Sequence, residues 1–238
     1  MEDFERYGDY NEYEEDMPKG KNPIAIILKV LVGVVCFAVV GVLVFRMVLF
    51  DYYPDSMKNI YFNDTLSAYY TATDGNIGAK TQKLRAPYDD PDKGRFFCDN
   101  LIVISGADQL QLSVRFNTSL VDTIYEDYGV TIDPDADNLF SFRLVRNPVD
   151  EDSKPTVIGE LSYTATESCL MYRYYKLVFD GVDFGLDEGE NKVNWIRLEV
   201  FLNGVEMKEP YMVAVYENNE LFSAFEDYIP TEEELAGR

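Results

Sequence analysis

The chain of 238 residues contains no histidine, and this absence excludes several kinds of site. Serine or cysteine nucleophiles activated by a neighbouring imidazole cannot be built from this chain, and neither can metal sites that use imidazole nitrogen. No remaining side chain has an unperturbed pKa near neutrality, because histidine is the residue that titrates there. Much of known enzyme chemistry is therefore excluded.

Basic residues are also scarce, with 21 lysines and arginines against 43 acidic residues and a net charge of −22. Residues 51–238 hold 35 acidic and 16 basic residues, a net charge of −19. Such a field repels phosphate backbones and anionic lipid headgroups. We therefore predict no nucleic-acid partner. Cations and basic surfaces are compatible partners, although acidity also serves solubility alone.

Only three cysteines are present, and Cys36 lies within an apolar run. In an exported domain, Cys98 and Cys169 form a candidate disulfide that would close a loop of about 70 residues and stabilise the domain by roughly 4 kcal/mol. The alternative is two buried thiols. The spacing is that of the inter-sheet bridge of immunoglobulin domains, but the single tryptophan, Trp195, follows both cysteines instead of lying between them. The match is therefore partial.

The longest apolar run extends from Ile24 to Phe50 and contains two charges, Lys29 and Arg46. As a helix it would reach about 40 Å, against a hydrocarbon core of about 30 Å, and both charges can extend to opposite interfaces. Arg46 and large apolar residues follow the centre of the run, where a cleaved signal would carry small residues. We predict a retained transmembrane helix over residues 23–50, in contact with membrane lipid.

Basic residues are more frequent before the apolar run than after it: Lys19, Lys21 and Lys29 against Arg46 and Lys58. This imbalance favours a cytoplasmic N-terminus and an extracytoplasmic C-terminal domain, the type II arrangement of a single-pass cell-membrane protein. Tyr52 and Tyr53 are then expected in the outer aromatic belt.

Composition divides the rest of the chain. Residues 1–22 mix acids with tyrosine, glycine and proline, as in a disordered cytoplasmic tail. Residues 51–94 are predicted to form a juxtamembrane segment, with short helices near Met57 and Leu66 and a loop from Lys80 to Gly94. Residues 95–220 are predicted to form one β-sandwich. Residues 221–238 are predicted to form a C-terminal segment, with a docked helix near Leu221 and a frayed acidic end.

Alternating apolar and polar residues predict the strands of this sandwich. An Asn203-Gly204 pair marks a tight hairpin turn, and the strand ending at Asp180 has large residues on both faces, which implies burial on both. The predicted strands are 96–104, 110–116, 140–144, 156–164, 169–180, 196–202, 205–207 and 211–216. The expected fold class is all-β, an antiparallel immunoglobulin-like β-sandwich preceded by one transmembrane α-helix.

Candidate sites are few. An EF-hand at Asp133, Asp135 and Asp137 is excluded, because Asn138 and Leu144 stand where the motif needs glycine and glutamate. An irregular calcium site remains open as an alternative to a solvated loop, using these acids or a second acidic group: Asp183, Asp187, Glu188 and Glu190. We predict no catalytic residue, no cofactor and no defined metal site.

Four stretches of the sequence resemble a family of single-pass membrane proteins: Tyr53–Lys58, Lys83–Tyr88, Phe96–Leu101 and Gln109–Asn117. The chain is similar over about residues 20–220 to uncharacterised proteins of Gram-positive bacteria with an immunoglobulin-like β-sandwich ectodomain. The resemblance implies a location in the cell envelope. It implies no activity and no site residue.

The leading hypothesis is a non-enzymatic, membrane-anchored envelope protein whose extracytoplasmic sandwich binds another envelope protein or a cell-wall ligand. One alternative is a carboxylate-based glycan hydrolase, which would need two acids with raised pKa in one deep cleft. Another is a structural spacer or assembly subunit.

Overall fold

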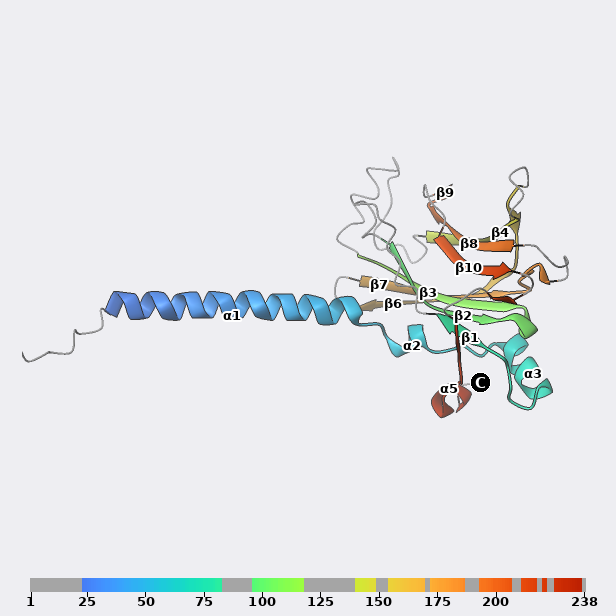
Figure 1. The fold of residues 1–238 in the computed structure, drawn as a ribbon, viewed down its shortest axis with the longest axis horizontal. Coiled ribbons are helices and arrows are strands. Elements are labelled where there is room, and N and C mark those ends of the chain that lie inside the picture. The colour runs from blue at the N-terminus through green and yellow to red at the C-terminus, as the bar shows by residue number, and fades with distance from the viewer. Residues whose placement is uncertain are drawn as a thin grey trace, which may run out of the picture. The chain divides into compact units, whose positions relative to one another are not determined.

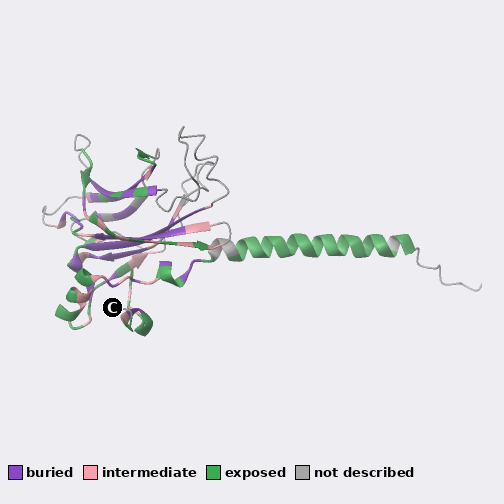
Figure 2. Cartoon of the chain, turned by 180° about the vertical axis from the view of Figure 1, so that it is seen from behind, coloured by how far each residue is buried: buried purple, intermediate pink, exposed green. Residues whose placement is uncertain are grey.

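The computed structural model describes residues 23–82, 96–117, 140–148, 154–169, 172–186, 193–206, 211–217, 220–221 and 225–236. These residues form two compact units, which divide between Tyr52 and Tyr53. The first contains helix α1 (Pro23–Asp51), of which Ile26–Val48 is long and apolar enough to cross a membrane. The α1 side chains are exposed along its length (Figure 2). A helix apolar on all sides is suited to a lipid environment, so the prediction of one apolar helix over 23–50 is confirmed.

The second unit contains two antiparallel sheets, which form separate layers in Figure 1. Sheet A has the order β12 (Glu226–Asp227), β1 (Lys80–Gln82), β2 (Phe96–Ile104), β3 (Gln109–Asn117), β7 (Tyr172–Asp180) and β6 (Glu160–Cys169). Sheet B has the order β11 (Glu220–Leu221), β10 (Tyr211–Glu217), β8 (Val193–Leu202), β4 (Phe140–Pro148) and β5 (Thr156–Val157), and β9 (Val205–Glu206) pairs with β8.

The main hydrophobic core lies between the facing sides of the two sheets. Alternate residues of β3 and β7, such as Leu112 and Leu177, enter it from sheet A, and Leu144 and Leu198 enter it from sheet B. Phe116 of β3 meets Phe140 of β4 edge to face, with ring centroids 4.9 Å apart. The period-2 pattern therefore buries one face of each sheet, and the prediction of a mostly β unit in antiparallel sheets is confirmed.

Two turns show how the sequence ends its strands. Asn203 and Gly204 both have positive φ, 48° and 82°, and join β8 to β9 as the predicted hairpin. The predicted strand over 156–164 is wrong as a single element, because its first part is β5 of sheet B and its later part belongs to β6 of sheet A. The chain changes sheet at Gly159, whose φ of 74° suits glycine.

Sheet A is covered on its other side as well. The covering elements are α2 (Asp55–Lys58), α3 (Asp64–Ala72) and α5 (Glu232–Ala236), which lie together below the sheets in Figure 1. Ile60, Phe62 and Leu66 join Ile102 and Ile104 of β2 in a second apolar cluster. We call residues 53–63 the covering segment. The helices predicted near Met57 and Leu66 are confirmed, and the Asn63 side chain caps α3 by accepting from Leu66 N at 3.0 Å.

Several predicted boundaries are wrong. Tyr53 is expected in the outer aromatic belt, but it is 2% exposed and its ring packs on Tyr174 with centroids 4.9 Å apart. Strand β1 begins the stretch predicted as a loop, and β12 lies beyond the predicted end of the sandwich. Leu221 lies in strand β11 and not in the predicted docked helix. The expected frayed end instead contains helix α5, with Glu234 buried. Strands of two or three residues are too short to show a period, which explains why the pattern missed them.

Candidate functional site

A polar stripe runs along the side of β3 that faces away from the core. Gln109, Gln111, Ser113 and Arg115 alternate with core residues, yet all four are buried beneath the covering segment. The Gln111 side chain accepts from Tyr61 N at 2.8 Å and donates to Tyr61 O at 2.7 Å, and Ser113 Oγ donates to Met57 O. These side chains satisfy backbone groups of Tyr61 and Met57 in the covering segment, which pairs with no strand among the described residues.

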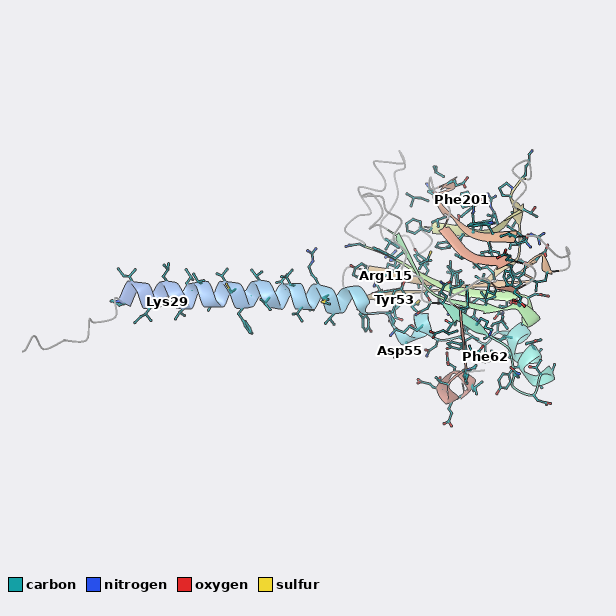
Figure 3. The ribbon with its side chains drawn as sticks, in the orientation of Figure 1. Lys29, Tyr53, Asp55, Phe62, Arg115 and Phe201 are labelled. Carbon is teal, nitrogen blue, oxygen red and sulfur yellow. The ribbon has the colours of Figure 1, made fainter. Side chains whose placement is uncertain are left out.

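Arg115 ends the stripe at an aromatic cage. Its guanidinium carbon lies 5.1 Å from the ring centre of Tyr53, 5.3 Å from that of Phe97 and 5.0 Å from that of Tyr172. Arg115 and Tyr53 are labelled close together in Figure 3. Aromatic faces attract a cation at these distances, so the buried charge of Arg115 is accounted for.

Lys176 lies beside this stripe and is the unusual residue of the domain. On β7 it pairs with Ser113 of β3 and with Ala165 of β6, and it is 1% exposed. No described group lies within hydrogen-bonding distance of its Nζ atom. A buried ammonium group normally has an acceptor, because leaving water without one is costly.

A pocket of about 260 Å³ opens over this lysine. The covering segment, β6, β7 and α5 supply its walls: Ser56, Asn59, Ile60, Tyr61, Phe62, Tyr163, Ala165, Lys176, Glu233 and Glu234. The Tyr61 and Tyr163 rings stack with centroids 3.8 Å apart and an interplanar angle of 9°. The pocket therefore combines an aromatic wall, a cation and two carboxylates.

Burial sets the protonation of the lysine. It lowers the pKa of Lys176 from 10.5 to about 7, and the nearby Glu234 carboxylate opposes this change only in part. The amine therefore loses its proton at a much lower pH than an exposed lysine does. A negatively charged group that entered the pocket would favour the protonated form.

Glu234 has its own hydrogen-bond partners. Its Oε1 atom accepts from Ile60 N at 2.6 Å and from the Tyr228 hydroxyl, and its Oε2 atom accepts from Thr231 N at 2.7 Å and Thr231 Oγ1 at 2.9 Å. Burial alone would raise the pKa of Glu234, but the hydrogen bonds from Tyr228, Thr231 and Ile60 together hold it below its usual range. Glu234 thus fastens the covering segment to α5 and is saturated by these donors.

The Thr231 side chain in turn accepts from Glu234 N at 3.3 Å, which completes a capping box at the start of α5. The pattern Thr231-Glu-Glu-Glu234 was a signal that could have placed this helix from sequence. Lys176 also had a signal, because it lies in the strand predicted to be buried on both faces. Neither residue was among the sequence-predicted sites.

The candidate disulfide is wrong. Cys98 lies in the core between the sheets, whereas Cys169 packs on the opposite face of sheet A, and no disulfide joins them. Strands β3 and β7 separate β2 from β6, so the two residues lie about 14 Å apart across the sheet at roughly 4.8 Å per strand. A disulfide needs Cα atoms within about 7 Å of each other.

Of the seven acids predicted as possible calcium ligands, only one lies in the described part of the chain. Asp133, Asp135 and Asp137 lie outside the described residues, as do Asp187, Glu188 and Glu190. Asp183 is described, and its carboxylate lies 3.1 Å from Arg146 in an ion pair. Within the described ranges, no cluster of three acidic or cysteine ligands is present.

The outer face of sheet B carries a smaller polar group. Arg143 forms an ion pair with Glu199 at 2.5 Å, and its guanidinium carbon lies 4.9 Å from the ring centre of Phe201, labelled in Figure 3. Arg143 and Glu199 pair with each other, so neither shows the unmet hydrogen-bonding capacity found at Lys176.

Comparisons with protein-family models, with curated proteins and with solved structures each returned no match for this chain.

Proposed function

We propose that this chain is a type II single-pass protein of the cell membrane whose extracytoplasmic, immunoglobulin-like sandwich binds an envelope protein or a cell-wall ligand without transforming it. The apolar helix and the excess of lysines before it support this location. The observation that carries the binding role is the pocket over Lys176, where a buried amine lacks an acceptor among the described residues.

The pocket does not favour the glycan hydrolase. A general acid needs a carboxyl group with a raised pKa, so that it holds a proton at neutral pH. The pKa of Glu234 is lowered, and its four donors keep it ionised. Glu234, the pocket carboxylate that acts electrostatically on Lys176, is therefore suited to holding α5 in place.

A crosslinking experiment in intact cells tests the binding role. A photoreactive amino acid replaces Asn59, which lines the pocket, or Ile229, which is exposed and does not line it. We expect one recurrent crosslinked product from position 59 that is absent when Lys176→Met is added, and no such product from position 229. A pure spacer would give no recurrent product at either position. Turnover of wall polymer by the purified protein that Glu233→Gln abolishes would establish an enzyme instead.

A further inference from the structure

We propose that the pocket over Lys176 receives the terminal carboxylate of a peptide. This inference rests on the proposed function and names the ligand class of its site. It begins with the amine, which is 1% exposed and has no acceptor among the described groups. Glu234 cannot supply that acceptor in the observed arrangement, because four donors already occupy its oxygens.

The pocket walls favour a group with a single negative charge. Two glutamates line the same space, and the domain carries a strong net negative charge, so a phosphate or another dianion would be repelled about twice as strongly as a monoanion. A carboxylate carries one charge and accepts hydrogen bonds from an ammonium group. Glu233 lies exposed on α5 at the same pocket and suits a cationic group next to that carboxylate.

The size and remaining groups favour the end of a peptide. A volume of about 260 Å³ is below the roughly 300–1,000 Å³ of pockets for drug-sized ligands, so it accommodates one or two residues. Ala165, directly opposite Lys176 across the β6–β7 pair, also lines the pocket and contributes only a methyl group. Asn59 offers an amide for a peptide bond, and the Tyr61–Tyr163 pair offers an aromatic wall. Capture of a terminal carboxylate is a recurrent mode of peptide recognition.

The experiment uses the purified full-length chain in detergent and isothermal titration calorimetry. The probe is N-acetyl-lysyl-alanine with a free carboxylate, compared with the same peptide ending in an amide. We expect the acid to bind at least about tenfold more tightly than the amide, because only the acid pairs with the ammonium group. Lys176→Met should abolish this preference. Lys154→Met removes an exposed lysine outside the pocket and should leave it unchanged.

One further variant and one further pair of peptides test the fit and the source of the ligand. Ala165→Val narrows the pocket without removing the amine and should weaken binding of the acid. Peptides ending in L-alanine or D-alanine distinguish a protein C-terminus from the D-alanine ends of wall peptides.

The affinity of the acid should also fall above pH 7, by up to about tenfold per pH unit, as the amine loses its proton. Glu233 and Glu234 of α5, Tyr61 of the covering segment and Tyr163 of β6 face the same pocket. Burial and Tyr61 raise the pKa of Tyr163, so this tyrosine stays neutral over the range tested.

Equal binding of acid and amide, or binding that survives Lys176→Met, would overturn carboxylate recognition. So would the absence of binding by every peptide. In that last case, a product crosslinked at position 59 that still depends on Lys176 would leave the proposed function standing with a different ligand. Loss of that crosslinked product as well would contradict both the carboxylate ligand and the proposed binding function.

Discussion

At the scale of single residues, Lys176 makes the stability of the domain depend on pH. Its folded pKa of about 7 lies below the 10.5 of an unfolded chain, so the unfolded state binds more protons between these values. The free energy of unfolding therefore rises with pH in this window, by at most about 1.4 kcal/mol per pH unit. Below pH 7 both states are protonated, and the cost of burying the charge is present in full.

Replacing Lys176 by methionine should therefore stabilise the domain and remove this dependence. We expect the free energy of unfolding at pH 7 to rise by about 1–3 kcal/mol, the usual cost of a buried donor without an acceptor. Urea unfolding between pH 6 and pH 9.5 measures both effects. Lys154→Met is the control and should retain the slope of the unmodified protein. An identical slope in Lys176→Met would show that another group titrates.

A residue retained at such a cost is consistent with use in binding, since functional sites often reduce stability.

The two cysteines of the domain, in contrast, only fill space in apolar clusters. Cys98 packs among core residues as a small apolar side chain, and Cys169 packs against the cluster of Tyr53, Met57 and Tyr174.

At the scale of elements, the covering segment makes sheet A an inner layer. Its backbone is fastened by side chains from three places: Gln111 and Ser113 of β3, and Glu234 of α5. The contact of Ile60 with Glu234 joins residues 174 positions apart. Contacts at this separation make the cover depend on elements from opposite ends of the domain.

Removing the Glu234 carboxylate should loosen the cover. Glu234→Ala leaves Ile60 N and Thr231 N without an acceptor, so we expect a loss of about 1–3 kcal/mol in the free energy of unfolding. Hydrogen exchange at the Ile60 amide should become faster. Glu232→Ala, an exposed change on the same helix, is the control. Unchanged exchange at Ile60 would contradict the role given to Glu234.

The same carboxylate should affect acid stability. Its folded pKa is lowered, so its contribution is present above the ordinary value of 4.5 and is lost as pH falls through the folded value. Glu234→Ala should therefore differ from the unmodified protein less in strong acid than at neutral pH.

Local sequence patterns predict much of this fold and little of its site. Strands β2, β3, β7 and β8 have enough residues to show a period, and Asn203-Gly204 marks its hairpin unambiguously. The alternation on β3 correctly identifies two faces, but Gln111 and Ser113 look like surface residues until the covering segment is placed over them. Lys176 and Glu234 come together only through tertiary contacts, which no local period encodes.

At the scale of the whole molecule, one apolar helix precedes a domain that contains its own core. Residues from Tyr53 onward form a separate compact unit, and their charge is strongly negative. We expect protease added to intact cells to remove the domain and leave a fragment that contains α1. A reporter fused before residue 1 should remain protected as the internal control. Complete protection of a correctly inserted protein would place the domain in the cytoplasm and contradict the proposed orientation.

The bond between Ile60 and Glu234 also has a consequence for how the protein is made. At a translation rate of about 5–20 residues per second, the chain takes roughly 9–35 s to extend over the 174 positions from Ile60 to Glu234. Throughout that interval the backbone N–H of Ile60 lacks its Glu234 acceptor, and the apolar cluster of Ile60 and Phe62 lacks Tyr228 and Leu235. The protein should therefore depend on a chaperone at the site of its release, and slowing translation should lengthen that dependence.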